Sequence, residues 1–139
     1  MAFASIVKAA QSRGTDNKYG SGQFGASRDK GTRKHKGLDV KAVPHEAVFS
    51  PLDGVIVREC VPYAPFTGLL IRGTGEHSGY EVKLFYVQGL ACGPVKAGEL
   101  VGAAEDLSVK YPGITNHVHL EIRKNGKVVP PLDFYEMCF

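Results

Sequence analysis

Apolar and polar residues alternate in short runs from Gly37 onward, and turn-forming residues separate these runs at intervals of about ten residues. The pattern predicts strands at Ala47–Phe49, Val55–Arg58, Leu69–Arg72, Tyr80–Val87, Glu99–Ala103 and His117–Arg123. Turns or loops are predicted at Thr74–Gly79, Gly93–Gly98 and Ser108–Asn116. Short strands without helical segments between them indicate an all-β antiparallel sandwich or partly open barrel.

Two short motifs give the strongest turn signals in the chain. Pro51-Leu52-Asp53-Gly54 lies between the first two predicted strands, and its residue types favour a tight turn. Asn125-Gly126 follows the last predicted strand. Because Asn and Gly both tolerate positive φ, this pair predicts a two-residue hairpin.

The N-terminal third of the chain has a different pattern. Phe3, Ile6, Val7 and Ala10 recur at helical spacing, which predicts a short amphipathic helix. Gln11–Arg33 is polar and rich in small residues, and we predict an irregular arm there. We therefore expect one domain over residues 1–139, with the helix and arm in residues 1–33 and the β core in residues 34–139.

Composition supports this interpretation and excludes some classes of function. The 139 residues include 17 Gly and 8 Pro, which favour tight turns over long helices. The net charge of +3 is too small to indicate a nucleic-acid partner, and no apolar stretch is long enough to insert across a membrane. Six Lys or Arg residues between Arg28 and Lys41 form either an anion-facing patch or an ordinary solvated loop.

The cysteines predict a fold that does not depend on disulfides. Cys60, Cys92 and Cys138 are far apart and form no C-x-x-C pair, so a cysteine-rich zinc site is not indicated. An odd number of cysteines leaves at least one without an intrachain partner, which favours a reducing compartment. Cys60 and Cys92 are expected to be small buried or half-buried residues, away from any activating cluster. The apolar segment at the N-terminus has no basic start or clear cleavage site, so a signal peptide is not predicted.

His117-Val118-His119 is the first candidate for chemistry. Side chains alternate along a strand, so both histidines lie on one face, while Val118 lies on the other. An H-x-H pair on a strand suits a metal or catalytic site, although it also occurs on ordinary polar strand faces.

His35 and Asp39 form the second candidate. Both side chains can reach one cation if the segment turns or enters a strand, and Gly37 gives the backbone freedom to turn. Taken alone, Asp39 could cap a turn and His35 could be a surface residue. Two histidines and one carboxylate fit a zinc site with an open fourth position for water. The remaining histidines, His45 and His77, are expected to be exposed.

These motifs resemble those of a known family. H-x-x-x-D followed much later by H-x-H is similar to the metal signature of the lysostaphin-type zinc endopeptidases, which cut bacterial cell-wall peptides. The likeness extends through Ala47–Val57, Gly93–Gly102 and His117–Lys127, and on to Pro131-Leu132-Asp133. The chain resembles more closely the animal branch of this fold, the leukocyte cell-derived chemotaxin 2 and myeloid protein family. The segments that carry this second likeness are Gly22-Gln23-Phe24, His35–Val40, Lys83-Leu84-Phe85-Tyr86 and Lys110–Ile114.

The resemblance implies a role for each matching residue. His35, Asp39 and His119 would be the zinc ligands. His117 would lie beside the metal and, if the protein is active, would polarise the zinc-bound water or stabilise the transition state. The implied fold is a compact antiparallel β domain of the lysostaphin-like peptidase type, with long loops around a groove.

The sequence departs from this family pattern in two respects. The peptidases carry a further catalytic histidine in a Tyr-x-His pattern, where this chain has Tyr86-Val87-Gln88. An amide cannot transfer a proton, and losing such a group typically lowers the rate by ~10²–10⁴. The secreted chemotaxins are stapled by disulfides, but this chain has Val7, Ala42 and Arg123 at cysteine positions of that family.

We therefore favour a zinc-binding, non-catalytic protein of the chemotaxin type with an immune or cytokine-like signalling role. Its partner would be a protein receptor or a bacterial cell-wall glycan or peptide. The alternative is a zinc metalloendopeptidase that cleaves peptidoglycan-type or Gly-rich peptides, and a third possibility is a metal-free interaction domain. The family analogy predicts secretion, while the replaced cysteines keep a cytoplasmic location open.

Overall fold

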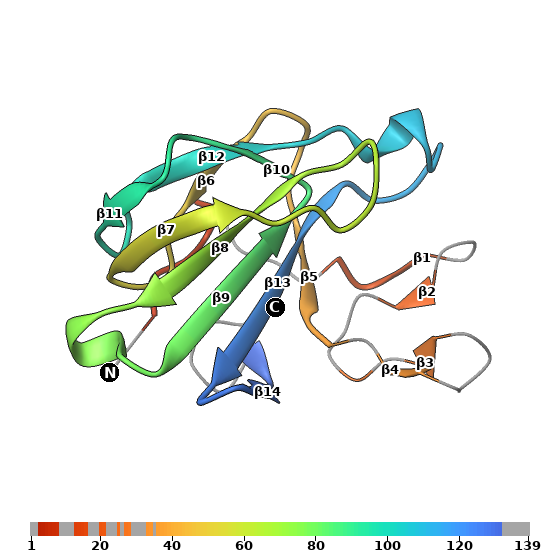
Figure 1. Ribbon diagram of the computed structural model, residues 1–139. Coiled ribbons are helices and arrows are strands. Elements are labelled where there is room, and N and C mark those ends of the chain that lie inside the picture. The colour runs from red at the N-terminus through yellow and green to blue at the C-terminus, as the bar shows by residue number, and fades with distance from the viewer. Residues whose placement is uncertain are drawn as a thin grey trace.

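A computed structural model describes residues 3–8, 13–16, 20–21, 25, 27–28, 33–34 and 36–131. Its main sheet is antiparallel and has seven strands, in the order β11-β7-β8-β9-β13-β14, with β5 also paired to β13 (Figure 1). These strands are β5 (Leu38–Lys41), β7 (Gly54–Glu59), β8 (Gly68–Gly73), β9 (Tyr80–Phe85), β11 (Gly93–Val95), β13 (His117–Lys124) and β14 (Lys127–Val129).

The other elements are shorter. A second sheet has the order β10-β12-β6, formed by β6 (Ala47–Phe49), β10 (Val87–Gly89) and β12 (Leu100–Ala104). Two-residue strands pair in the N-terminal arm, namely β1 (Thr15–Asp16) with β2 (Gly20–Ser21) and β3 (Ser27–Arg28) with β4 (Arg33–Lys34). The described residues also form the 3₁₀ turns η2 (Gly75–His77) and η3 (Leu107–Val109).

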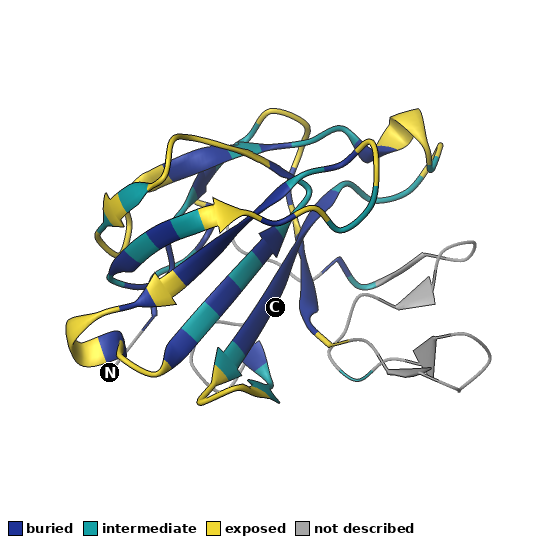
Figure 2. Cartoon of the chain, viewed as in Figure 1, coloured by how far each residue is buried: buried dark blue, intermediate teal, exposed yellow. Residues whose placement is uncertain are grey.

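The core lies between the two sheets and follows the alternation of the strands. On β9, Tyr80, Val82 and Leu84 are buried, whereas the residues between them are only partly buried (Figure 2). Val48 and Val101 of the smaller sheet belong to the same apolar cluster as these residues. Because successive side chains point to opposite faces, burying one face of β9 and β13 leaves the other for polar groups.

The predicted all-β antiparallel fold is confirmed; Ala47–Phe49 is a strand with the predicted bounds, and the other predicted strands are present with shifted ends. Tyr80–Val87 is not one strand, because Tyr86 has φ of 68° and separates β9 from β10, which lie in different sheets. Gly93–Val95, predicted as part of a turn, pairs with β7 as an edge strand.

The two turn motifs serve different connections. Asn125 and Gly126 have φ of 49° and 83° and join β13 to β14, which confirms the predicted hairpin. Pro51–Gly54 also turns the chain, but it connects β6 of the smaller sheet to β7 of the main sheet and forms no hairpin.

The predicted N-terminal helix is wrong over residues 3–8, which are irregular and end in a turn; Ala9 and Ala10 lie outside the described residues. Phe3, Ile6 and Val7 are nevertheless buried, as their apolar character requires. The backbone of this segment bonds to the body of the domain: the Ala4 N–H donates to Pro51 and the Phe49 N–H to Ile6. Across the part of the chain that the structure describes, no helix has the length and apolarity needed to cross a membrane.

Candidate functional site

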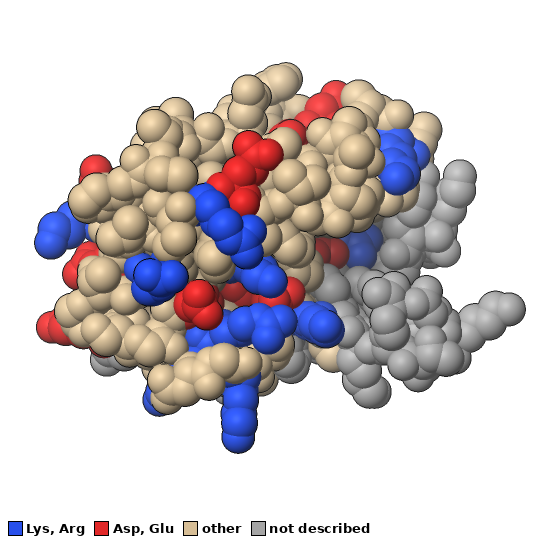
Figure 3. All heavy atoms as spheres, in the orientation of Figure 1, with Lys and Arg blue, Asp and Glu red and all other residues tan. Residues whose placement is uncertain are grey.

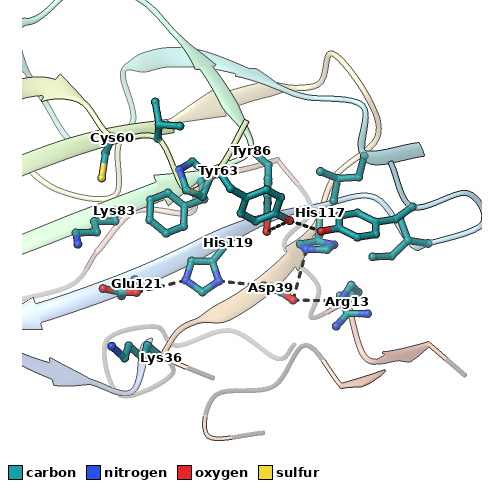
Figure 4. Close-up of a pocket in the computed structure, with 16 residues that line it drawn as sticks. Arg13, Lys36, Asp39, Cys60, Tyr63, Lys83, Tyr86, His117, His119 and Glu121 are labelled. Carbon is teal, nitrogen blue, oxygen red and sulfur yellow. Dashed lines mark hydrogen bonds and ion pairs between the residues drawn. The ribbon is translucent and has the colours of Figure 1, made fainter. Parts of the chain in front are cut away.

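A groove of about 780 Å³ opens on the polar face of the main sheet (Figure 4). Asp39 of β5, Phe85 of β9 and His119 of β13 form the centre of its floor. In the strand register His119 lies directly opposite both Asp39 and Phe85. His117 and His119 were predicted to share one face of a strand, and both histidines line this groove. Three aligned positions on three neighbouring strands, together with His117, therefore converge on one small polar centre.

The His119 ring lies between two carboxylates and is stacked on Phe85, with ring centroids 5.3 Å apart. Its Nδ1 is 3.2 Å from Asp39 Oδ1, and its Nε2 is 3.5 Å from Glu121 Oε1. Burial pulls the pKa of His119 down, but the hydrogen bonds to Asp39 and Glu121 outweigh burial and leave this pKa raised. A neutral imidazole carries one N–H, so contact with two carboxylates requires a second proton or another cation.

These donor atoms fit a zinc ion as far as they are described. Two donors on tetrahedral zinc, each about 2.0–2.1 Å from the metal, lie roughly 3.3 Å apart. The 3.2 Å between His119 Nδ1 and Asp39 Oδ1 matches that separation. The third predicted ligand, His35, lies outside the described residues, and among the described ones no group of three His, Cys, Asp or Glu is placed to hold a metal.

His117 presents one ring nitrogen to the same carboxylate. Its Nδ1 is 2.9 Å from the Thr115 carbonyl, which can only accept, so Nδ1 carries the hydrogen. Its Nε2 lies 3.4 Å from Asp39 Oδ2. Burial lowers the pKa of His117, so its ring is neutral near pH 7. The Nε2 lone pair therefore points toward the site, the orientation that a base needs.

Arg13 was missed by sequence reasoning, which assigned it only to an irregular arm. Its Nε donates to Asp39 Oδ2 at 3.2 Å, and its backbone N–H donates to the Asp39 carbonyl at 2.7 Å. The two side chains are only 2% and 6% exposed. Arg13 therefore neutralises one oxygen of Asp39 and leaves the other directed at His119. The local sequence around Arg13 contains no signal for this contact.

Glu121 and Arg123 support His119 from the other side, and neither was predicted to do so. Arg123 donates to Glu121 Oε2 through Nε at 3.2 Å and lies 3.1 Å from it through Nη2. Burial works to raise the pKa of Glu121, but the bond to His119 and the charges of Arg123 and Lys83 leave it lowered. A carboxylate on the outer nitrogen of a ligating histidine fixes the ring and increases its basicity. The i, i+2 spacing after His119 could have indicated this partner.

Position 37 requires glycine because no side chain fits between its backbone and strand β13, and not because the chain turns there. A Cβ on Gly37 would lie 2.4 Å from the Leu120 carbonyl oxygen and 2.7 Å from His119 Nε2. The backbone before Asp39 therefore packs directly on the His119 ring. The predicted freedom to turn is the wrong explanation, because Gly37 is not among the glycines with positive φ.

Three tyrosines form one end of the groove. The Tyr63 hydroxyl is 2.6 Å from that of Tyr111 and 3.0 Å from that of Tyr86. Burial raises the pKa values of Tyr63 and Tyr86, so both hydroxyls stay protonated at neutral pH. The Tyr86 ring contacts the His117 ring edge to face, with centroids 5.5 Å apart. The tyrosines are therefore neutral hydrogen-bonding groups next to His117.

Gln88, which stands at the position of the family's further histidine, does not line the groove. It is exposed and lines a second hollow of about 370 Å³ together with His45. Tyr86, two residues earlier, points into the groove in its place. The positive φ of Tyr86 redirects the strand, so the sequence pattern does not predict which side chain faces the site.

The predictions for the other histidines and for the cysteines are confirmed only in part. His45 is exposed as predicted, but His77 is not: only 4% exposed, it accepts the Asp53 N–H through Nδ1 at 3.0 Å and packs on Phe3. Cys60 is buried as expected, yet it lines the groove. Cys92 was expected to be at least half-buried and is exposed. Cys138 lies outside the described residues.

Comparison with known proteins identifies relatives over most of the chain. No protein-family model matches the chain. Leukocyte cell-derived chemotaxin-2 of Mus musculus is 37% identical over 77% of this chain and 70% of the relative. The Bos taurus protein of the same name is 33% identical over 74% of this chain and 68% of the relative. Myeloid protein 1 of Gallus gallus is 35% identical over 78% of this chain, which spans only 34% of that relative.

Solved structures share the fold at low sequence identity. Helicobacter pylori Csd3 matches 99% of this chain with a TM-score of 0.72 and 18% identity, and the match covers 35% of that structure. A zinc-containing peptidase from Vibrio cholerae matches 93% with a TM-score of 0.63 and 20% identity, over 39% of its length. Lysostaphin matches 84% with a TM-score of 0.59 and 17% identity, over 49% of its length. The SpoIIQ–SpoIIIAH complex matches 96% with a TM-score of 0.69 and 18% identity, over 90% of that chain. The fold is therefore that of the lysostaphin-like peptidases.

Proposed function

Because the chain belongs to the leukocyte cell-derived chemotaxin-2 family, we propose that it is a single-domain, zinc-binding protein that recognises a partner without cleaving it. His35, Asp39 and His119 would hold the metal. The observation that carries this proposal is the 3.2 Å approach of His119 Nδ1 to Asp39 Oδ1, with Glu121 on the outer nitrogen of the ring. Donors of this kind and spacing suit zinc.

Bound zinc would supply a positive charge and a cross-link between the segment of His35 and strand β13. Because a metal that binds only the folded state stabilises that state, this cross-link would raise the stability of the domain. Asp39 and His119 would orient the metal, Glu121 would hold the His119 ring, and the groove around them would receive the partner.

The groove supports recognition better than hydrolysis because its described lining contains no further histidine for proton transfer beyond His117 and His119. Among the described residues, His117 and His119 are the histidines that line it, and His119 is assigned to the metal. Gln88 is exposed in a separate hollow, as is His45. A peptidase of this fold would need a second group to protonate the leaving amine.

Zinc content after dialysis and the zinc-induced change in Tm test the metal proposal. The wild-type protein should retain about one zinc per chain, and zinc should raise its Tm above the value in chelator. His119→Ala should abolish that zinc-induced rise. Because the His119 ring packs on Phe85, this variant will also lose stability in chelator, so only the difference between the two conditions reports the ligand role. An unchanged zinc-induced rise in His119→Ala would exclude His119 as a ligand.

The alternative function, a zinc metalloendopeptidase, is favoured by one specific feature. The Nε2 lone pair of His117 faces the site, and the tyrosine hydroxyls lie beside it as neutral donors for a developing oxyanion. Zinc-loaded protein incubated with peptidoglycan or pentaglycine should release no new amino groups above a His117→Ala control. Release that disappears in His117→Ala would instead establish a peptidase.

We propose that the partner is a protein receptor or a bacterial cell-wall glycan or peptide, and that the protein is secreted like its family. The SpoIIQ–SpoIIIAH complex shows that this fold occurs in a protein–protein assembly. The presence of Val7, Ala42 and Arg123 at the family's cysteine positions is the argument against export. Detection of the full chain in the culture medium of producing cells would decide between the two compartments.

A further inference from the structure

The groove has chemically different ends on either side of Asp39 and His119, and from this we propose the class of its ligand. We infer that it binds an extended peptide with an acidic group at the end formed by Lys36 and Lys83 and an apolar or aromatic side chain at the tyrosine end. This inference rests on the proposed function, because it takes the groove as the binding surface.

The cationic end has more positive than negative charge. Lys36 is exposed and Lys83 is partly buried, both line the groove, and neither forms an ion pair with another described residue. The single carboxylate beside them, Glu121, is already paired with Arg123 at 3.1 Å and faces His119. Figure 4 shows Lys36 and Lys83 on the same side of His119, one on each side of Glu121.

The surface around the cationic end also carries more positive than negative charge. Figure 3 shows Lys and Arg atoms gathered around acidic atoms on the polar face of the main sheet. In the register of this face, Lys83 is opposite Glu121, and Glu81 is opposite both Arg72 and Arg123. Basic side chains thus outnumber acidic ones, and the acidic group nearest the groove is buried and paired. An incoming carboxylate therefore meets Lys36 and Lys83, neither of which forms an ion pair with a described carboxylate, although Lys83 lies opposite Glu121.

The opposite end is aromatic and neutral. The hydroxyls of Tyr63, Tyr86 and Tyr111 are bonded to one another, so the tyrosines offer a ligand mainly ring surface. Leu107 and Ile114 line the same groove. Val61, also in the lining, is 54% exposed and adds apolar surface to this end. A ligand side chain that covers Val61 and the tyrosine rings would remove this apolar surface from water.

The two ends together define an extended ligand. On β9, Lys83 lies two residues before Phe85, and Tyr86 directly follows Phe85. Because Phe85 is paired with His119 in the strand register, this pair of residues separates the two ends of the groove. A chain that contacts both ends must cross Asp39 and His119, where the proposed metal lies. A peptide with small residues between an acidic and an aromatic residue satisfies this arrangement.

Calorimetric titration of zinc-loaded protein with defined peptides tests the inference. The probes are acetyl-Glu-Gly-Gly-Gly-Phe-amide, its Lys counterpart, its Gly counterpart at the Phe position, and each sequence in reverse order. The Glu/Phe peptide, in one of the two orders, should bind at least tenfold more tightly than the Lys/Phe and Glu/Gly peptides. Its affinity should fall in 0.5 M salt, because exposed charges are screened.

Charge reversal provides the matched comparison. Lys36→Glu combined with Lys83→Glu should invert the preference to the Lys/Phe peptide, whereas Lys96→Glu, an exposed position outside the groove, should leave it unchanged. Equal affinity for the Glu and Lys peptides, or no measurable binding of any peptide to zinc-loaded protein, would overturn the inference. Wild-type protein that does not retain zinc would instead overturn the proposed function.

Discussion

Replacing Arg13 by Gln is expected to lower the free energy of unfolding by about 3–5 kcal/mol in chelator, because it removes one buried partner of the Arg13–Asp39 ion pair. The guanidinium of Arg13 is the cation 3.2 Å from Asp39 Oδ2, and both side chains are almost inaccessible to water. A buried charge without a partner is strongly unfavourable, whereas the intact pair contributes little net stability. Urea unfolding measured at equilibrium gives the free energy directly.

Arg58→Gln is the control for this substitution. Arg58 is exposed, and among the described residues its guanidinium donates only to the neighbouring Glu59 carbonyl, at 3.1 Å, so its loss should change stability by less than about 0.5 kcal/mol. Saturating zinc should reduce the loss in Arg13→Gln, because the proposed metal supplies Asp39 with another cation. If Arg13→Gln and Arg58→Gln unfold at the same urea concentration, the Arg13–Asp39 pair does not support the site.

Replacing Gly37 by Ala is expected to weaken zinc binding at least tenfold and to destabilise the domain by about 1–3 kcal/mol, the usual range for overpacking. The added Cβ would lie 2.4 Å from the Leu120 carbonyl oxygen and 2.7 Å from His119 Nε2. Neither neighbour can move freely, since Leu120 belongs to the central strand and the His119 ring is stacked on Phe85. Displacing this ring changes the position of its Nδ1 relative to Asp39. Competition with a zinc-sensitive dye measures the affinity.

Gly98→Ala is the control that separates a loss of zinc affinity from a loss of stability. Gly98 has φ of 87° and open space around its Cβ position, so alanine there introduces backbone strain without touching the groove. Gly98→Ala should lose stability and keep the zinc affinity of the wild type. Wild-type zinc affinity in Gly37→Ala would mean that the His119 ring does not need the close approach of this backbone.

The sequence determined the β fold and the candidates at the centre of the groove because both depend on local rules. Alternation along Tyr80–Phe85 and His117–Lys124 fixes which face is apolar, whatever the strands pair with. For the same reason His117 and His119 had to share a face. The family resemblance implied that Asp39 and His119 bind one metal, and the strand register places the two residues opposite each other. Their role as metal ligands remains a prediction.

The other features of the groove were decided by contacts between segments far apart in the chain. Arg13 is 26 residues from Asp39, and Tyr63 is 48 residues from Tyr111, so no local pattern links either pair. The apolar spacing of Phe3, Ile6 and Val7 was misleading in a related way, because their backbone bonds to the domain and not to its own turn. Gln88, at the position of the family's further histidine, lies outside the groove, and the positive φ of Tyr86 redirects the strand just before it. Local propensity and periodicity determine what each strand buries, but only the packed sheets determine which charges and rings meet in the groove.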